Sequence, residues 1–251
     1  MDRPTIVKLL VSEGQRLFEA RSAFVEFTKH AAADKLLNDL DGHSHAFVLA
    51  CIMDRQIKAE RAWIIPYRFS EKLGDLQFGT LLQLSLLDIR EIMTKPEPLH
   101  RFPEEMSNNF YAAVQMIAQE YEGKAARIWS GQPSSAEVVY RFLRFRGAGP
   151  KIATMATNIL ARDFKVPFAD YYSIDVSVDV QVRRVFTRLG LCQQSDDVES
   201  IIYLSRALHP TFPGLLDFPA WEIGRKWCRP HNPMCAQCIM QPVCPSVGGA
   251  S

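Results

Sequence analysis

The stretch that most restricts the fold of this chain lies between Glu137 and Leu160. An amphipathic run at 137–145 is followed by Arg146-Gly147-Ala148-Gly149-Pro150-Lys151 and then by a second run at 152–160. Glycine provides the backbone freedom with which helices often end, and proline suits the first turn of a helix because its missing N–H has no partner there. The stretch therefore predicts two helices joined by a tight turn. Such a turn directs backbone N–H groups and the positive end of a helix dipole at one point, where an anion such as a phosphate can bind.

The rest of the sequence favours helices as well. Helical patterns occur at 5–20, 31–40, 78–93 and 109–121, and a further helix is expected to start at Ser195, with this serine as its N-cap. The segment 46–53 is apolar on every side, which is typical of a helix buried within a domain. No stretch alternates with a period of two residues, so the sequence predicts an all-α fold.

The distribution of charged residues along the chain restricts the function more than the overall composition does. The 251 residues are 47% hydrophobic and carry a formal net charge of +1, which is typical of a soluble globular protein of one large or two small domains. Residues 140–190 contain nine Lys or Arg against four Asp, whereas residues 88–123 contain seven acids against three bases. One face can therefore be basic, as a surface that follows DNA phosphates requires. Without a membrane-span pattern or a signal-peptide layout, we expect a cytoplasmic protein, nucleoid-associated if prokaryotic.

Four cysteines near the end of the chain suggest a metal centre. Cys228, Cys235, Cys238 and Cys244 follow the spacing C-x6-C-x2-C-x5-C. Disulfides are disfavoured without a secretion signal, and a zinc ribbon more often offers two separated C-x2-C pairs. Four thiolates in a compact segment suit a [4Fe–4S] cluster, with zinc as the alternative.

Two segments resemble a known family. The pattern Gly147-Ala148-Gly149-Pro150-Lys151-Ile152-Ala153, followed by Val-Asp-Val-Gln-Val-Arg-Arg-Val at 178–185, resembles the helix-hairpin-helix and catalytic aspartate of the DNA glycosylase superfamily, and its endonuclease III branch in particular. The resemblance extends over about residues 45–244 and includes the spacing of that branch's [4Fe–4S] cysteines. It implies that Lys151 is the nucleophilic lysine of a glycosylase with lyase activity and that Asp179 is the superfamily's aspartate. Asp175 is a rival, but only Asp179 is followed by residues that match the family.

The resemblance also implies where double-stranded DNA binds. Gln56 falls where the family places a glutamine that fills the gap left by an extruded nucleotide. The other expected contacts lie in the hairpin turn and in the cysteine loop, at Arg146, Gly147, Ala148, Gly149 and Arg229.

The domain organisation implied by the family is a pair of helical lobes. Residues 45–161 would form a helical barrel that ends in the hairpin, and 1–44 together with 162–251 would form the iron–sulfur lobe. DNA would bind in the cleft between them, where Lys151 and Asp179 would meet. Lys151 precedes Asp179 by 28 residues, more than the family usually has, and the aromatic residues of this insertion at 161–172 are expected to pack rather than to line a base pocket.

The sequence thus predicts a base-excision repair DNA glycosylase. It would act as a monomer, remove a damaged or mismatched base from duplex DNA, and cleave the resulting abasic site. An amine nucleophile gives a Schiff base and permits strand cleavage, whereas an activated water leaves an abasic site. A monofunctional enzyme in which Asp179 activates water stays open, because Arg146 stands where the family usually has proline. A non-catalytic DNA-binding relative and a small iron–sulfur electron carrier are further alternatives.

Overall fold

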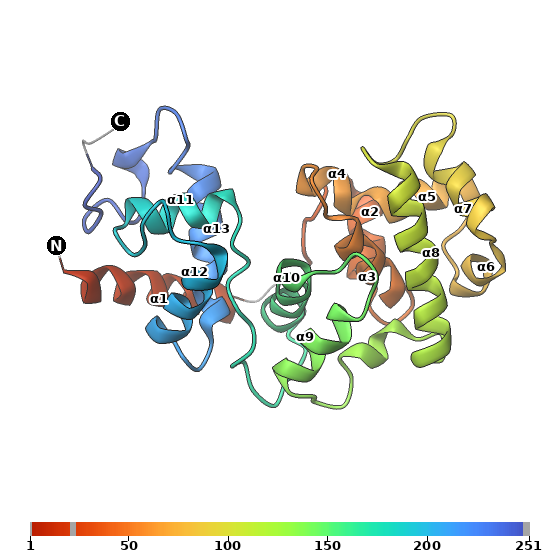
Figure 1. Cartoon of the computed structure of the whole chain (residues 1–251), viewed down its shortest axis with the longest axis horizontal. Helices are drawn as coiled ribbons and strands as arrows, with labels where there is room; N and C mark the ends of the chain where they lie inside the picture. Colours follow the sequence, from red (N-terminus) through yellow and green to blue (C-terminus); the bar gives the residue numbers. More distant parts are fainter. Residues whose placement is uncertain (1, 21–23, 248–251) are drawn as a thin grey trace. The chain divides into compact units, whose positions relative to one another are not determined.

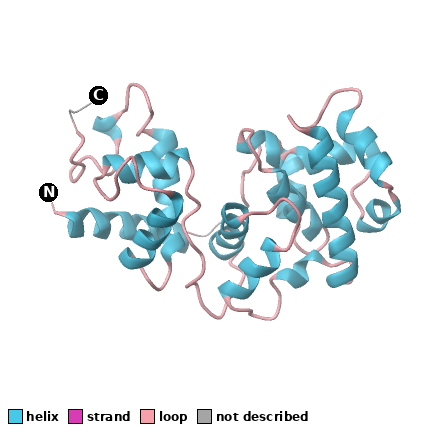
Figure 2. Ribbon diagram, viewed as in Figure 1, coloured by secondary structure: helices cyan, strands magenta, loops and turns pink. Residues whose placement is uncertain are grey.

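The computed structural model describes residues 2–20 and 24–247, and every regular element within these ranges is a helix (Figures 1 and 2). The predicted all-α fold is therefore confirmed. In the part of the chain that is described, no helix combines the length and the apolar character that crossing a membrane would require.

The chain divides into two compact units, which are described separately below. The cysteine unit consists of Met1–Arg21, Ser134–Val139 and Thr157–Ser251, and the hairpin unit consists of Ser22–Pro133 and Tyr140–Ala156. This division differs from the lobes expected from the sequence, because residues 24–44 group with the hairpin unit. The physical reason is local packing: Phe27 stacks on Trp63 with ring centroids 4.4 Å apart, and the helix at Ala31–Asn38 packs against two helices of this unit.

The hairpin unit is built around helix α3 (Ser44–Met53). All ten of its residues are buried, as its uniformly apolar sequence predicted. Helices α2, α4, α5 and α8 and the 3-10 turn η1 pack around it (Figure 1). Each large apolar side chain that is buried in this way contributes about 1.5–3 kcal/mol, so α3 fixes the position of the loop that follows it.

The bounds of the surrounding elements differ in several places from those expected: α4 and α5 were not predicted, and α8 begins at Pro103 rather than at residue 109. They are α2 (Ala31–Asn38), α4 (Ala59–Trp63), α5 (Ile65–Leu73), α6 (Phe78–Gln83), α7 (Leu86–Thr94), α8 (Pro103–Glu120) and η1 (Ala125–Ile128). The sequence predicted one helix over 78–93, but the structure has two. Ser85 begins the second one because it forms a capping box with Asp88: the Ser85 Oγ accepts from Asp88 N at 3.2 Å, and Ser85 N donates to Asp88 Oδ2 at 2.8 Å.

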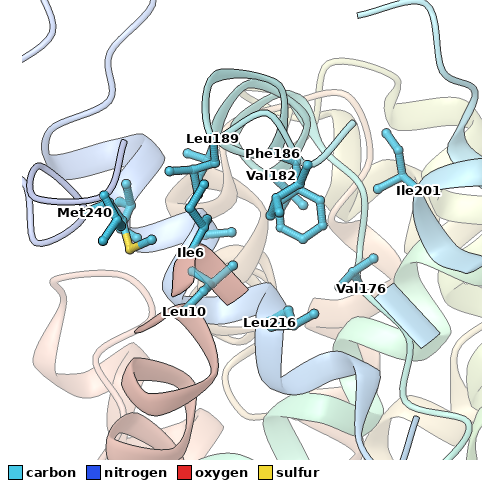
Figure 3. Packing of buried hydrophobic residues seen from close by; sticks show 14 residues of the cluster. Ile6, Leu10, Val176, Val182, Phe186, Leu189, Ile201, Leu216 and Met240 are labelled. Carbon is cyan, nitrogen blue, oxygen red and sulfur yellow. The ribbon is translucent and has the colours of Figure 1, made fainter. Parts of the chain in front are cut away.

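The cysteine unit has its own apolar core. Its helical elements are α1 (Arg3–Glu19), α11 (Val180–Arg188), α12 (Val198–Leu208), η2 (Pro213–Leu216), α13 (Asp217–Lys226) and η3 (Cys235–Gln237). Figure 3 shows Phe186, Leu189 and Ile6 within this core, together with Met240 from the segment between the cysteines. The cysteine segment is therefore anchored by its own buried side chains. The predicted N-cap at Ser195 was wrong: α12 begins at Val198, and Asp197 caps it by accepting from Ser200 N at 2.7 Å.

Candidate active site

The hairpin turn joins α9 (Ser135–Leu143) to α10 (Pro150–Arg162). Ala148 N donates to Phe145 O at 3.0 Å, and Ala153 N donates to Gly149 O at 3.0 Å where α10 begins. Of the two glycines, only Gly147 has a positive φ, +88°. Gly149 has no atom within 4 Å of the position that a Cβ would take, so its missing side chain leaves the outer surface of the turn open to a ligand.

Two phenylalanines attach this turn to the core of the hairpin unit. Phe142 and Phe145 are 0% and 2% exposed. Phe142 stacks with Trp129, with centroids 6.5 Å apart, and Phe145 with Tyr121 at 6.2 Å. The next residue, Arg146, is exposed. The two buried phenylalanines therefore fix the inner side of the turn to the core. The exposed Arg146 places a positive charge on its outer side.

Lys151 is the second residue of α10, and its side chain is exposed. Pro150 occupies the first position of the helix, as the sequence predicted, and its carbonyl accepts from Thr154 Oγ1 at 2.9 Å. Lys151 belongs to the hairpin unit and Asp179 to the cysteine unit. The approach of these two side chains to each other stays a prediction.

Asp179 is the N-cap of α11. Its Oδ1 accepts from Gln181 N at 2.8 Å and from Val182 N at 2.9 Å. Both hydrogen bonds use the same oxygen, and among the described residues Oδ2 forms none. The cap therefore leaves one carboxylate oxygen available to a substrate, so a structural and a chemical role are compatible in one side chain.

The rival carboxylate, Asp175, has a different environment. It is 7% exposed, and its two oxygens accept from Arg206 Nε and Nη2, both at 2.8 Å. A bidentate pair of this kind uses both oxygens. Asp175 is therefore a structural ion-pair partner, which favours Asp179 as the reactive carboxylate.

The four cysteines of the loop are all partly buried. Burial raises the pKa of the Cys238 thiol, and the charges of Cys228, Cys244 and Cys235 raise it further. The pKa of Cys244 is raised in the same way, by burial first and then by Cys228 and Cys235. Cys238 and Cys244 are thus each near enough to Cys228 and Cys235 for a charge on those thiols to raise their pKa.

Within residues 2–20 and 24–247, no three His, Cys, Asp or Glu side chains are grouped so that they could hold a metal ion. The binding of a metal centre by the four cysteines therefore stays a prediction.

Two arginines of α11 bind the start of the cysteine loop. Arg184 Nε donates to Cys228 O at 2.7 Å, and its Nη2 donates to Gly224 O at 3.0 Å. One turn later, Arg188 Nη1 donates to Arg229 O at 2.7 Å and lies 3.5 Å from Cys228 Sγ. Arg229 itself points an exposed side chain outward. Sequence reasoning missed the roles of Arg184 and Arg188, because their partners lie about forty residues away and only their i,i+4 spacing was visible.

Gln56 lies in the loop between α3 and α4. Its side chain is exposed, and its φ is +55°. A positive φ is uncommon for a residue with a side chain, and such residues concentrate at functional sites. The neighbouring Arg55 pairs with Glu105 of α8 at 2.9 Å, which holds this loop on the unit.

The insertion at 161–172 packs within the cysteine unit. The Tyr171 ring stacks on Phe212 at 4.8 Å, and Phe18 meets both rings edge-on at 5.7 and 5.4 Å. Phe168 is 9% exposed. The expected packing is confirmed for Phe168 and Tyr171, whereas Tyr172 is 61% exposed.

Comparisons with known proteins agree on one fold. No family model matches the chain. Endonuclease III from Thermotoga maritima is 26% identical over 156 residues, which cover 60% of this chain and 64% of that protein, so the match spans a little under two thirds of the relative's length.

Solved structures match over almost the entire chain. A trapped endonuclease III–DNA covalent intermediate, the estranged-adenine complex, has a TM-score of 0.62 at 18% identity and covers 98% of this chain and 97% of its own. A thermostable thymine-DNA glycosylase has a TM-score of 0.65 at 14% identity, with 98% of both chains covered. At these identities the structures establish the fold. The chain is thus similar in sequence to endonuclease III and similar in fold to solved structures of endonuclease III and of a thymine-DNA glycosylase.

Proposed function

We propose that this protein is a base-excision repair DNA glycosylase that removes a damaged or mismatched base from duplex DNA and has abasic-site lyase activity. The observation that carries the proposal is the exposed Lys151 in the first turn of α10, directly after a glycine turn with an open outer surface. The names of the relatives support it, since endonuclease III and thymine-DNA glycosylase both act on DNA. We expect the protein to act as a monomer in the cytoplasm.

Lys151 and Asp179 divide the chemistry between them. The lysine amine attacks C1′ of the deoxyribose, so that an N–C bond forms, the glycosidic bond breaks, and the amine's proton is passed on to the leaving base. The nitrogen lone pair then breaks the C1′–O4′ bond, O4′ takes up a proton, and the sugar ring opens to a Schiff base between Lys151 and C1′. The Schiff base acidifies C2′, and loss of a proton from C2′ expels the 3′ phosphate. The Asp179 carboxylate stabilises the positive charge that develops on the sugar, a role that is often worth several kcal/mol.

The hairpin turn and the cysteine loop bind the DNA backbone. At the turn, the open surface at Gly149 and the backbone of Gly147 and Ala148 accept a phosphate at the start of α10, while the exposed Arg146 and Arg229 neutralise phosphate charge. Gln56 enters the base stack after the target nucleotide has been extruded, which costs a few kcal/mol and least for damaged pairs.

The cysteine loop holds a [4Fe–4S] cluster through Cys228, Cys235, Cys238 and Cys244. Support comes from the C-x6-C-x2-C-x5-C spacing of the four cysteines and from the contact of Arg188 with Cys228 Sγ. The four cysteines would hold the cluster, which would cross-link the segments of the loop. Zinc is the alternative occupant, and the purified protein distinguishes the two, since the cluster is coloured and zinc is not.

Borohydride trapping on an abasic duplex tests the nucleophile. Wild-type protein should give a covalent adduct and Lys151→Ala should give none, whereas Lys35→Ala, which removes an exposed lysine from α2 of the same unit, should trap as the wild type does. Adducts with the Lys151→Ala variant would reject Lys151 as the nucleophile.

A monofunctional enzyme is the second candidate. It is favoured by Arg146, which stands at the turn where the resembled family usually has proline. In that case, a panel of lesion-bearing duplexes would show base release by the wild type without any trappable adduct, and Asp179 would activate the attacking water. Failure to release any base while duplex DNA is still bound would instead indicate a non-catalytic DNA-binding relative.

A further inference from the structure

Asn109 of α8 has a buried side chain with an unused donor. The residue is 2% exposed, and its Nδ2 has no hydrogen-bond partner among the described residues. A buried amide without a partner destabilises the fold, and such a group in a native protein usually has a role that compensates for the cost.

The amide lies directly against the hairpin turn. A Cβ added to Gly147 would stand 2.5 Å from Asn109 Nδ2 and 2.9 Å from its Cγ. Gly147 is thus required for two independent reasons, its φ of +88° and the close approach of this side chain. Both residues belong to the hairpin unit.

Other asparagines in this chain show that the fold can satisfy buried and partly buried amides. Asn158 is also 2% exposed, and its Nδ2 donates to Gly214 O at 3.0 Å. Asn38 Nδ2 donates to Val25 O at 2.9 Å and to Asp34 O at 2.7 Å. Asn108, the half-buried neighbour of Asn109, likewise donates to Glu104 O at 2.9 Å. An ordinary packing role therefore does not account for the unused donor at Asn109.

The geometry of a peptide group indicates what this donor is for. In a trans peptide, the N–H and the C=O point in opposite directions. Ala148 N already donates to Phe145 O within the turn, so a phosphate at the turn would be met by the N–H of Gly149, and the carbonyl of the same peptide, Ala148 O, would point away from the phosphate. Asn109 Nδ2 is a donor that lies against this turn, 2.5 Å from the position that a Gly147 Cβ would take.

We propose that Asn109 is a positioning residue of the hairpin turn, whose amide donates to a backbone carbonyl of the turn when a DNA phosphate is bound. The inference rests on the proposed DNA-binding function and adds a residue that acts from behind the turn. In the DNA-free protein the amide lowers stability; in the complex the new hydrogen bond adds to affinity.

Replacement of Asn109 by leucine tests the inference, because leucine has the same branched arrangement of four side-chain heavy atoms and no donor. Asn109→Leu should leave the Tm unchanged or raise it, since an unpartnered buried amide is removed. It should also weaken binding to an abasic-site duplex by about tenfold, the effect of losing one hydrogen bond that forms only in the complex. The salt dependence of binding should not change, because no charge is lost. Asn108→Leu, at the half-buried neighbouring position of α8, is the matched control and should bind as the wild type does.

Two outcomes would overturn the inference. One is wild-type affinity in Asn109→Leu; the other is a fall in Tm together with the fall in affinity, which would indicate packing alone. If Asn109→Leu fails to fold, the side-chain amide of the wild-type protein is followed by NMR, where slower hydrogen exchange of Asn109 Nδ2 on addition of duplex is expected and unchanged exchange overturns the inference. Wild-type protein that binds no duplex would reject the proposed function itself and the inference with it.

Discussion

Substitutions at Asp179 separate its structural role from its chemical role. Asparagine caps helices about as well as aspartate, so Asp179→Asn should keep the hydrogen bonds from Gln181 N and Val182 N that Oδ1 now accepts at 2.8 and 2.9 Å. Its Tm should stay close to that of the wild type. Asp179→Ala loses both bonds, which costs about 0.5–2 kcal/mol for an N-cap and lowers the Tm by roughly 2–4 °C per kcal/mol in a chain of this size.

The rates of base release of the two Asp179 variants should not parallel their Tm values. Both variants lose the negative charge at the developing oxocarbenium ion, so base release should slow by about 10²–10³-fold in each. Single-turnover base release, measured at saturating protein, removes differences in DNA affinity from the comparison.

The matched control is Asp197, which caps α12 through one hydrogen bond from Ser200 N at 2.7 Å. Asp197→Ala should lower the Tm as other cap losses do and leave base release unchanged. Normal base release in Asp179→Asn would refute the electrostatic role. Equal losses of activity in Asp197→Ala and Asp179→Ala would show that helix stability alone is being measured.

Three further predictions test other parts of the molecule. Cys238→Ser should turn a yellow-brown protein colourless and lower its Tm, whereas a colourless wild type with stoichiometric zinc would reject the [4Fe–4S] cluster. Arg146→Ala and Arg229→Ala should each weaken binding to all duplex sequences and reduce the salt slope by about one; unchanged binding in both would place the DNA elsewhere. Burial lowers the pKa of His45 from its ordinary value of 6.5. As the pH falls, His45 is therefore protonated in the unfolded chain before it is protonated in the folded one. The free energy of unfolding that neutral His45 contributes is present above pH 6.5 and should be lost as the pH falls below it. His45→Gln should flatten this part of the Tm–pH curve, and an unaltered curve would assign the acid sensitivity to other groups.

The features of the fold that could be predicted are those that a short segment determines by itself. The burial of helix α3 was predictable because a helix that is apolar on every side has no polar face for the solvent. The hairpin was predictable because glycine and proline each restrict the backbone locally. The break at Ser85 was missed because the apolar periodicity continues across it. A new helix begins there because the two hydrogen bonds of the capping box stabilise the chain more than one further turn of the preceding helix would.

For the candidate site, the sequence identified individual residues but not their partners. Asp179 was preferred to Asp175 because the residues that follow it match the resembled family, whereas the pairing of Asp175 with Arg206, 31 residues away, was visible only in the structure. Asn109 lies 38 residues before Gly147 in the sequence, and nothing in a single sequence indicates that a buried amide will face a turn so far along the chain.

Helix α11 connects the parts of the cysteine unit that matter for function. One face packs Val182, Val185 and Phe186 into the core (Figure 3). Its first residues donate to Asp179, and its arginines bind the loop that begins at Cys228. The cap, the core and the cysteine loop therefore depend on the same nine residues. A change in the loop that displaces α11 along its axis would move the Asp179 carboxylate with it, because Oδ1 is bound to the first turn of that helix. If Asp179 acts as proposed, the cysteine loop contributes to the chemistry without placing a side chain in it, because the loop binds the helix whose N-terminus holds the Asp179 carboxylate.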